Sequence, residues 1–129
     1  PPKPLNSQLK TDMDTTQSPL PLPPAPCSLT LAIDFDHTWT ADPHGWRAWH
    51  DLMVARGHIV LLATGRSGWS DDMSRAHLPA QMPIVYCGRD LKEHATRKAG
   101  WIVNIWIDDM PGMIQDCRIL GGDLSSANR

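Results

Sequence analysis

Residues 29–40 read Leu-Thr-Leu-Ala-Ile-Asp-Phe-Asp-His-Thr-Trp-Thr, an apolar run that stops abruptly at two carboxylates. The run is almost continuously apolar, which is typical of a strand covered on both faces in a parallel sheet. Ligands of such sheets bind outside the carboxyl ends of the strands. Asp34 and Asp36 therefore lie where a site is expected, and residues i and i+2 of an extended segment point to the same side. Two buried carboxylates need a cationic partner, and a metal ion would supply it.

The segments after this strand alternate in character. Asp42 and Pro43 are typical of a helix N-cap and first turn, and Gly57 is typical of a helix end. Strands that alternate with helices indicate an α/β protein with a parallel sheet and right-handed crossovers. We expect strands at residues 58–64, 82–86 and 101–107, helices at residues 43–56, 67–78 and 90–99, a helical turn at residues 111–116 and a short fifth strand at residues 118–120.

The first part of the chain differs in composition from the rest. Residues 1–26 hold eight of the twelve prolines and almost no periodic apolar pattern. Such a segment favours polyproline II or disorder, because burial cannot offset its ordering entropy. We expect a proline-rich flexible tail at residues 1–27, one folded domain at residues 28–121 and a frayed C-terminus at residues 122–129. A docking peptide for a partner is the alternative function of the tail.

Composition and charge narrow the class of protein. The chain has 129 residues and a formal net charge of −2, which fits one domain and gives no electrostatic footprint for bulk binding to nucleic acid or membranes. This net charge does not exclude a local basic patch. No apolar run approaches the roughly 20 residues of a membrane span. Cys27, Cys87 and Cys117 lack any CxxC spacing, so we expect reduced thiols and a cytoplasmic protein.

Polar side chains follow several of the predicted strands. Asp34, Asp36, Thr64, Asp108 and Asp109 all stand where a strand gives way to a loop. Because the carboxyl ends of parallel strands share one edge of the sheet, we expect these residues to converge. A carboxylate cluster without His or Cys suits a hard cation, most of all Mg²⁺. One carboxylate could attack phosphorus while a second acts as general acid and base.

Four motifs occur in a fixed order along the chain. They are DxDxT at Asp34, Asp36 and Thr38, a strand-ending Thr64, a helix-starting Lys92, and the acidic pair Asp108 and Asp109. This order resembles the haloacid dehalogenase superfamily of phosphohydrolases, in particular its small capless members of phage or bacterial type. The resemblance covers roughly residues 29–116. It implies a three-layer, Rossmann-like parallel sheet without a cap domain.

The resemblance also implies roles for the acids. Asp34 would be the nucleophile and a metal ligand, and Asp36 the general acid and base, with its backbone carbonyl on the metal. Asp108 would anchor Mg²⁺, with Asp109 either a second ligand or bound through water. The presence of Asp36 favours phosphatase chemistry over dehalogenation. His37 departs from the family pattern, since most members have Gly there.

The remaining motif residues would contact the substrate. Thr64 and Lys92 would hold the phosphoryl group, with Lys98 as the alternative to Lys92. Thr38, Gly65 and Arg66 are the expected substrate-binding residues.

Residues beyond the motifs leave further alternatives. Arg66 and Arg89 either contact a substrate phosphate or carboxylate or are surface charges. Trp39, where the family often has Leu, and Trp69 follow the first two motifs. They either pack in the core or at the rim, or border the site and stack a ring.

The short connections between the predicted strands and helices affect how large a substrate can reach the site. Thr64 and Met82 are separated by 17 residues, enough for one helix and a turn. We therefore expect an open site that admits a large phosphorylated substrate: a nucleotide, a nucleic-acid end or a phosphoprotein. A neighbouring copy in a homo-oligomer could instead close the site. The alternative function is a binding or adaptor protein that keeps the scaffold, docks through its proline-rich tail and has little or no turnover.

Overall fold

The computed structural model describes residues 22–115 of the chain. Its elements in chain order are β1 (Thr30–Ile33), η1 (Trp39–Ala41), α2 (Pro43–Ala55), β2 (Ile59–Thr64), α3 (Asp71–Ser74), β3 (Ile84–Tyr86), α4 (Lys92–Lys98), β4 (Ile105–Ile107) and η2 (Pro111–Met113).

The four strands form one parallel sheet in the order β3-β2-β1-β4. Strand β1 is central, and its last residue, Ile33, pairs with Leu62 of β2 and with Ile107 of β4. The residues after Ile33 and Ile107 are therefore neighbours across adjacent strands, which lie about 4.8 Å apart in such sheets. The predicted α/β class with a parallel sheet is confirmed.

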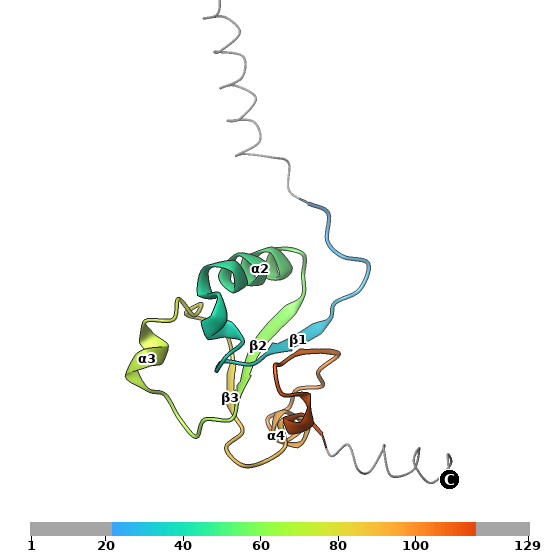
Figure 1. The fold of residues 1–129 in the computed structure, drawn as a ribbon. Coiled ribbons are helices and arrows are strands. Elements are labelled where there is room, and N and C mark those ends of the chain that lie inside the picture. The colour runs from blue at the N-terminus through green and yellow to red at the C-terminus, as the bar shows by residue number, and fades with distance from the viewer. Residues whose placement is uncertain (1–21, 116–129) are drawn as a thin grey trace, which may run out of the picture.

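Apolar side chains cover both faces of the sheet. On one face, Leu31 and Ile33 belong to a core that packs against Trp46, Trp49 and Met53 of α2. On the other face, buried residues of β1 and β2 pack against Ala95 of α4 and Trp106 of β4. Helices α2 and α4 thus lie on opposite sides of the sheet (Figure 1). This double cover explains why β1 and β2 lack the alternating polar pattern of a half-exposed strand.

The boundaries of α2 follow the predicted capping residues. The side chain of Asp42 accepts a hydrogen bond from the Gly45 N–H at 3.1 Å, and Pro43 occupies the first turn. Gly57 follows the helix with a φ of 96°, the left-handed conformation that favours glycine at helix ends. These residues direct the chain from α2 into β2.

Two predicted elements are shorter than expected by four residues or more. The last strand begins at Ile105 instead of Trp101, because the Asn104 side chain accepts the N–H of Thr30 at 2.8 Å, where β1 pairing would otherwise continue. The helix expected at residues 67–78 is a single turn, α3. Its N-cap, Ser70, has extended backbone, so residues 67–70 form a loop instead of a first helical turn.

The N-terminal segment contacts the domain as far back as it is described. The Ala25 N–H donates to the Arg56 carbonyl at 3.0 Å, and the Arg56 guanidinium donates to the Pro23 carbonyl at 2.8 Å. The rest of the predicted tail, the fifth strand at residues 118–120 and the C-terminal end lie outside the described residues. Within residues 22–115, no helix is long and apolar enough to cross a membrane.

Candidate functional site

The residue that follows β1, Asp34, is fixed by the sheet. Its N–H donates to the Ile107 carbonyl at 2.9 Å, so its backbone continues the pairing with β4. The Trp39 N–H donates to the Asp34 carbonyl at 3.1 Å, which closes a turn and brings Thr38 back toward the strand end. Asp34 is 7% exposed and Thr38 is 8% exposed. The first motif therefore places a buried carboxylate and a buried hydroxyl side by side.

Lys92 bridges two of the predicted acids. Its Nζ donates to Asp34 Oδ1 at 2.7 Å and to Asp108 Oδ2 at 2.6 Å, and all three side chains are almost completely buried. Lys92 is the first residue of α4, and the buried Thr96 donates to its carbonyl at 2.8 Å. Lys98 is exposed on the last turn of α4. The structure thus places Lys92, and not the alternative Lys98, among the acids.

Thr38 connects Asp34 to Asp109. Its Oγ1 lies 3.3 Å from Asp34 Oδ2 and 3.1 Å from Asp109 Oδ1, and it accepts the Asp109 N–H at 3.2 Å. A hydroxyl has one proton, so it donates to one of the two carboxylates at a time. The Asp108 Oδ1 accepts the Met110 N–H at 2.8 Å, which orients that side chain as well.

The three acids fit a divalent cation. Asp34, Asp108 and Asp109 each offer an oxygen, these oxygens lie within 4.8 Å of one another, and no other such group occurs in residues 22–115. Mg²⁺ prefers one or two carboxylates completed by water and substrate phosphate. The Lys92 ammonium contacts only Asp34 and Asp108, so a group of three carboxylates with one ammonium keeps an excess of negative charge that a cation would neutralise. The donor set is therefore consistent with Mg²⁺.

Burial and charge shift the pKa values in this centre. Burial raises the pKa of Asp34, against the opposing effect of its hydrogen bond with Lys92. Burial also disfavours the charged form of Lys92, but its hydrogen bonds with Asp108 and Asp34 outweigh this and raise its pKa. Hydrogen bonds with Asp34 and then Thr38 lower the pKa of Asp109. The centre therefore keeps Lys92 charged and discourages full ionisation of Asp34.

Asp36 lies outside this group of carboxylates. Arg66 holds it through two hydrogen bonds, Nη2 to Oδ1 at 2.7 Å and Nε to Oδ2 at 3.0 Å, and this lowers the pKa of Asp36. The guanidinium also donates to Ser70 and Asp72 and lies 4.9 Å above the Phe35 ring. An ionised Asp36 can accept a proton but not donate one. The expected contact between the Asp36 backbone carbonyl and the metal stays a prediction.

A small cavity of about 130 Å³ lies over the acids. Gly65 lines it from the end of β2, together with Asp34, Lys92, Asp108 and Asp109. Further lining residues are Asp36, His37, Met110 and Met113. The predicted Thr64 ends β2 but is fully buried, and its hydroxyl accepts the Arg66 N–H at 3.2 Å. Among the described residues, Gly65 and not Thr64 lines the cavity at the end of β2.

His37 has an unusual backbone. Its φ of 65° lies in the left-handed region that favours glycine, which gives a physical reason for the glycine that is usual at this position in the resembled family. Histidine is one of the few other residues enriched in this conformation, and the His37 N–H donates to Thr40 Oγ1 at 2.9 Å.

The two tryptophans that follow the first two motifs differ in burial. Trp39 is fully buried, and its indole N–H donates to the Ala76 carbonyl at 2.7 Å, so it is a core residue. Trp69 is 55% exposed.

Some residues around the site could not be found from the sequence. Asp72, Met110 and Met113 belong to no recognised motif. Asp72 accepts from Arg66 across an irregular loop, and Met110 and Met113 follow Asp109 in a short 3-10 turn, where no periodic pattern indicates which side chains turn toward the site. Comparisons with protein-family models, with curated proteins and with solved structures found no match.

Proposed function

We propose that this chain is a Mg²⁺-dependent phosphohydrolase that works through an aspartyl-phosphate at Asp34. The observation that carries the proposal is the convergence of Asp34, Lys92, Asp108 and Asp109 at the carboxyl edge of a parallel sheet. Such an edge is where α/β sheets bind ligands. The helices on both faces of the sheet further support a three-layer, Rossmann-like core of the haloacid dehalogenase type.

The buried carboxylate of Asp34 would attack the phosphorus of a phosphomonoester. The bond between phosphorus and the leaving oxygen breaks, and Asp36 donates a proton to that oxygen. Water then attacks the aspartyl-phosphate while Asp36 takes its proton, which releases inorganic phosphate and restores the Asp34 carboxylate. Lys92 and the backbone N–H groups near Gly65 would hold the phosphoryl oxygens.

The cation and the lysine would share the negative charge of the reaction. Asp34, Asp108 and Asp109 would hold Mg²⁺ directly or through water, and Mg²⁺ supplies Lewis-acid stabilisation of the phosphoryl group. Lys92 would keep its ammonium between Asp34 and Asp108 and so preserve the position of both carboxylates.

One contact favours a second candidate function. Proton donation by Asp36 requires that its ion pair with Arg66 open when substrate arrives, because the paired carboxylate is ionised. A chain in which this pair stays closed would bind a phosphorylated partner without turnover, as an adaptor protein does.

Turnover of glycerol 2-phosphate, a small phosphomonoester without a ring, tests the proposal. We expect hydrolysis with Mg²⁺ and none with a chelator. Asp34→Asn should lower kcat by about 10³-fold or more, because it removes the nucleophile. Asp71→Asn is the matched control, since Asp71 is exposed on α3. Equal turnover by Asp34→Asn and the wild type would refute the proposal.

A further inference from the structure

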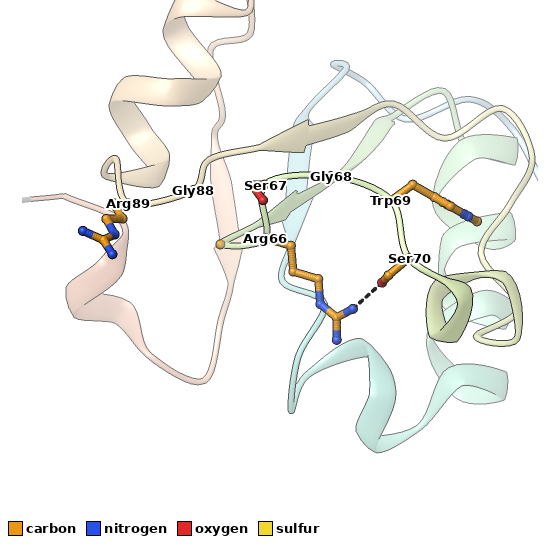
Figure 2. A pocket seen from close by; sticks show the side chains of 8 residues that line it. Arg66, Ser67, Gly68, Trp69, Ser70, Gly88 and Arg89 are labelled. Atoms are coloured by element: carbon orange, nitrogen blue, oxygen red, sulfur yellow. Dashed lines mark hydrogen bonds between the residues drawn. The ribbon is translucent and has the colours of Figure 1, made fainter.

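A second and larger hollow adjoins the small cavity. It has a volume of about 670 Å³ and lies between the loop after β2, residues 65–70, and the turn after β3, residues 88–89. Gly65 lines both the hollow and the cavity over the acids. Figure 2 shows Arg89 and Trp69 at opposite ends of the hollow, with Ser67 between them.

The two spaces differ in volume and therefore fit different parts of a substrate. The cavity over the acids, about 130 Å³, equals roughly four water volumes and suits a phosphoryl group but little more. The hollow is in the range of small-molecule sites, roughly 300–1,000 Å³. A substrate whose phosphoryl group reaches Asp34 would therefore place its leaving group in the hollow.

The hollow is lined by two arginines, whereas acids line the cavity beside it. No carboxylate is among its lining residues. The Arg66 guanidinium is already paired with Asp36 and Asp72. The Arg89 guanidinium has no hydrogen bond or ion pair with any described residue. Arg89 is therefore the lining cation that can bind an incoming anion without losing an existing partner.

The loop after β2 adds donors to the same space. Within residues 22–115, the backbone N–H groups of Ser67, Gly68 and Trp69 donate to no protein acceptor. Successive free N–H groups of a glycine-rich loop bind anionic oxygens well. Ser67 and Gly68 lie along the loop between Arg89 and Trp69 (Figure 2).

Trp69 supplies an apolar face at the other end. Trp69 is 55% exposed, whereas Trp39 is fully buried. Exposed indoles stack on heteroaromatic rings in nucleic-acid-binding proteins, and every base has a face for such a contact. Single exposed apolar residues are common, but this one lines the hollow that Arg89 also lines.

We infer that this hollow binds a nucleotide as the leaving group of the reaction, with a second phosphate at Arg89 and the base against Trp69. The inference rests on the proposed function and names its substrate class. The second phosphate would belong either to a free nucleoside bisphosphate or to the phosphodiester of a strand end.

Binding is tested first, without turnover. The probe is a dinucleoside monophosphate, which has bases and one phosphodiester but no phosphomonoester to hydrolyse. Equilibrium dialysis should give affinity for the wild type, a loss of about tenfold in Arg89→Gln and in Trp69→Leu, and recovery in Trp69→Phe. Arg75→Gln is the matched control, because Arg75 is exposed, has no ion pair among the described residues and does not line the hollow. Circular dichroism checks that each variant folds.

Turnover then assigns the leaving group. The ratio of kcat/KM for a nucleoside 3′,5′-bisphosphate to that for glycerol 2-phosphate should exceed one and fall about tenfold in Arg89→Gln. A phosphorylated dinucleotide distinguishes a strand end from a free nucleotide as the source.

The outcomes separate this inference from the proposed function. Hydrolysis of glycerol 2-phosphate with no preference for the bisphosphate, or with preference for a phosphoserine peptide, overturns the inference and leaves the phosphohydrolase standing. Equal binding of the dinucleoside probe by the wild type, Arg89→Gln and Trp69→Leu also overturns it. Binding of the probe without any turnover refutes the phosphohydrolase and the leaving-group assignment together.

Discussion

Two clusters of charge lie beside the same strand end, each with two carboxylates around one cation. The buried cluster is Asp34, Lys92 and Asp108, and the exposed cluster is Asp36, Arg66 and Asp72. In the buried cluster all three side chains are at most 8% exposed, whereas in the exposed cluster they are 27–50% exposed. The distances are nearly equal, so burial is the main physical difference between them.

The contrast shows that the distances within an ion pair do not by themselves determine how much the pair contributes to the free energy of unfolding. Water screens the exposed cluster, and exposed pairs contribute about 0.2–1 kcal/mol. In the buried cluster, loss of one partner leaves an uncompensated charge in a medium of low polarity. The three predictions that follow test the contrast.

The largest effect is expected from Lys92→Met. Removal of the ammonium leaves two buried carboxylates without their partner, which should lower the free energy of unfolding by about 3–5 kcal/mol. Urea unfolding in the presence of a chelator measures this. Under the proposed function, added Mg²⁺ should restore part of the stability, because it would bind the same carboxylates. Lys98→Met, on the exposed end of α4, is the control and should change little. A loss under about 1 kcal/mol would mean that burial does not separate the clusters.

Cys87 reports on the interior beside the buried cluster. Burial raises the pKa of its thiol from 9.0 to about 11. The folded-state pKa of this thiol is above that of the unfolded chain, so the folded state favours the protonated thiol. The resulting contribution to folding stability is complete below about pH 9 and is lost between about pH 9 and pH 11.

The pH dependence of stability then tests this environment. Between about pH 8 and pH 11, the wild type should lose about 2 kcal/mol more of its unfolding free energy than Cys87→Ala. Urea unfolding at both pH values measures it. Parallel losses in the two proteins would show that the thiol is solvated.

The smallest effect is expected from Arg66→Gln in the exposed cluster. Its loss should cost about 1 kcal/mol or less at neutral pH, because water screens the pairs, and the cost should shrink in about 1 M salt. The Arg66 hydrogen bonds lower the pKa of Asp36, so the stabilisation is present above the ordinary value of 3.8 and disappears as pH falls below it. Thermal unfolding of both proteins across this acid range measures it. A salt-independent cost would show that the cluster is effectively buried.

Strand periodicity and residue type were enough to predict most of the site. The strand ends at Ile33 and Thr64 and the position of Lys92 at a helix start follow from local patterns. The predicted convergence of Asp34 with Asp108 is confirmed by their shared contact with Lys92.

Other features depend on contacts between distant segments. The partner of Asp36 is Arg66, 30 residues away, and no local pattern indicates that pairing. The start of β4 was misplaced because the Asn104 side chain replaces a strand contact, and side-chain competition for a backbone N–H is not visible in apolar periodicity.

Local rules acting on neighbouring residues therefore account for the α/β class, the parallel sheet and the acids at its edge. They depend on periodicity, capping and the shared direction of strands, which are properties of short segments. Burial decided which of two similar charge clusters is costly to break and which tryptophan is core. Pairing with Asp36 and Asp72 decided which of the described arginines is already held. Burial is a property of the assembled chain, because it depends on segments that become neighbours only when the protein folds.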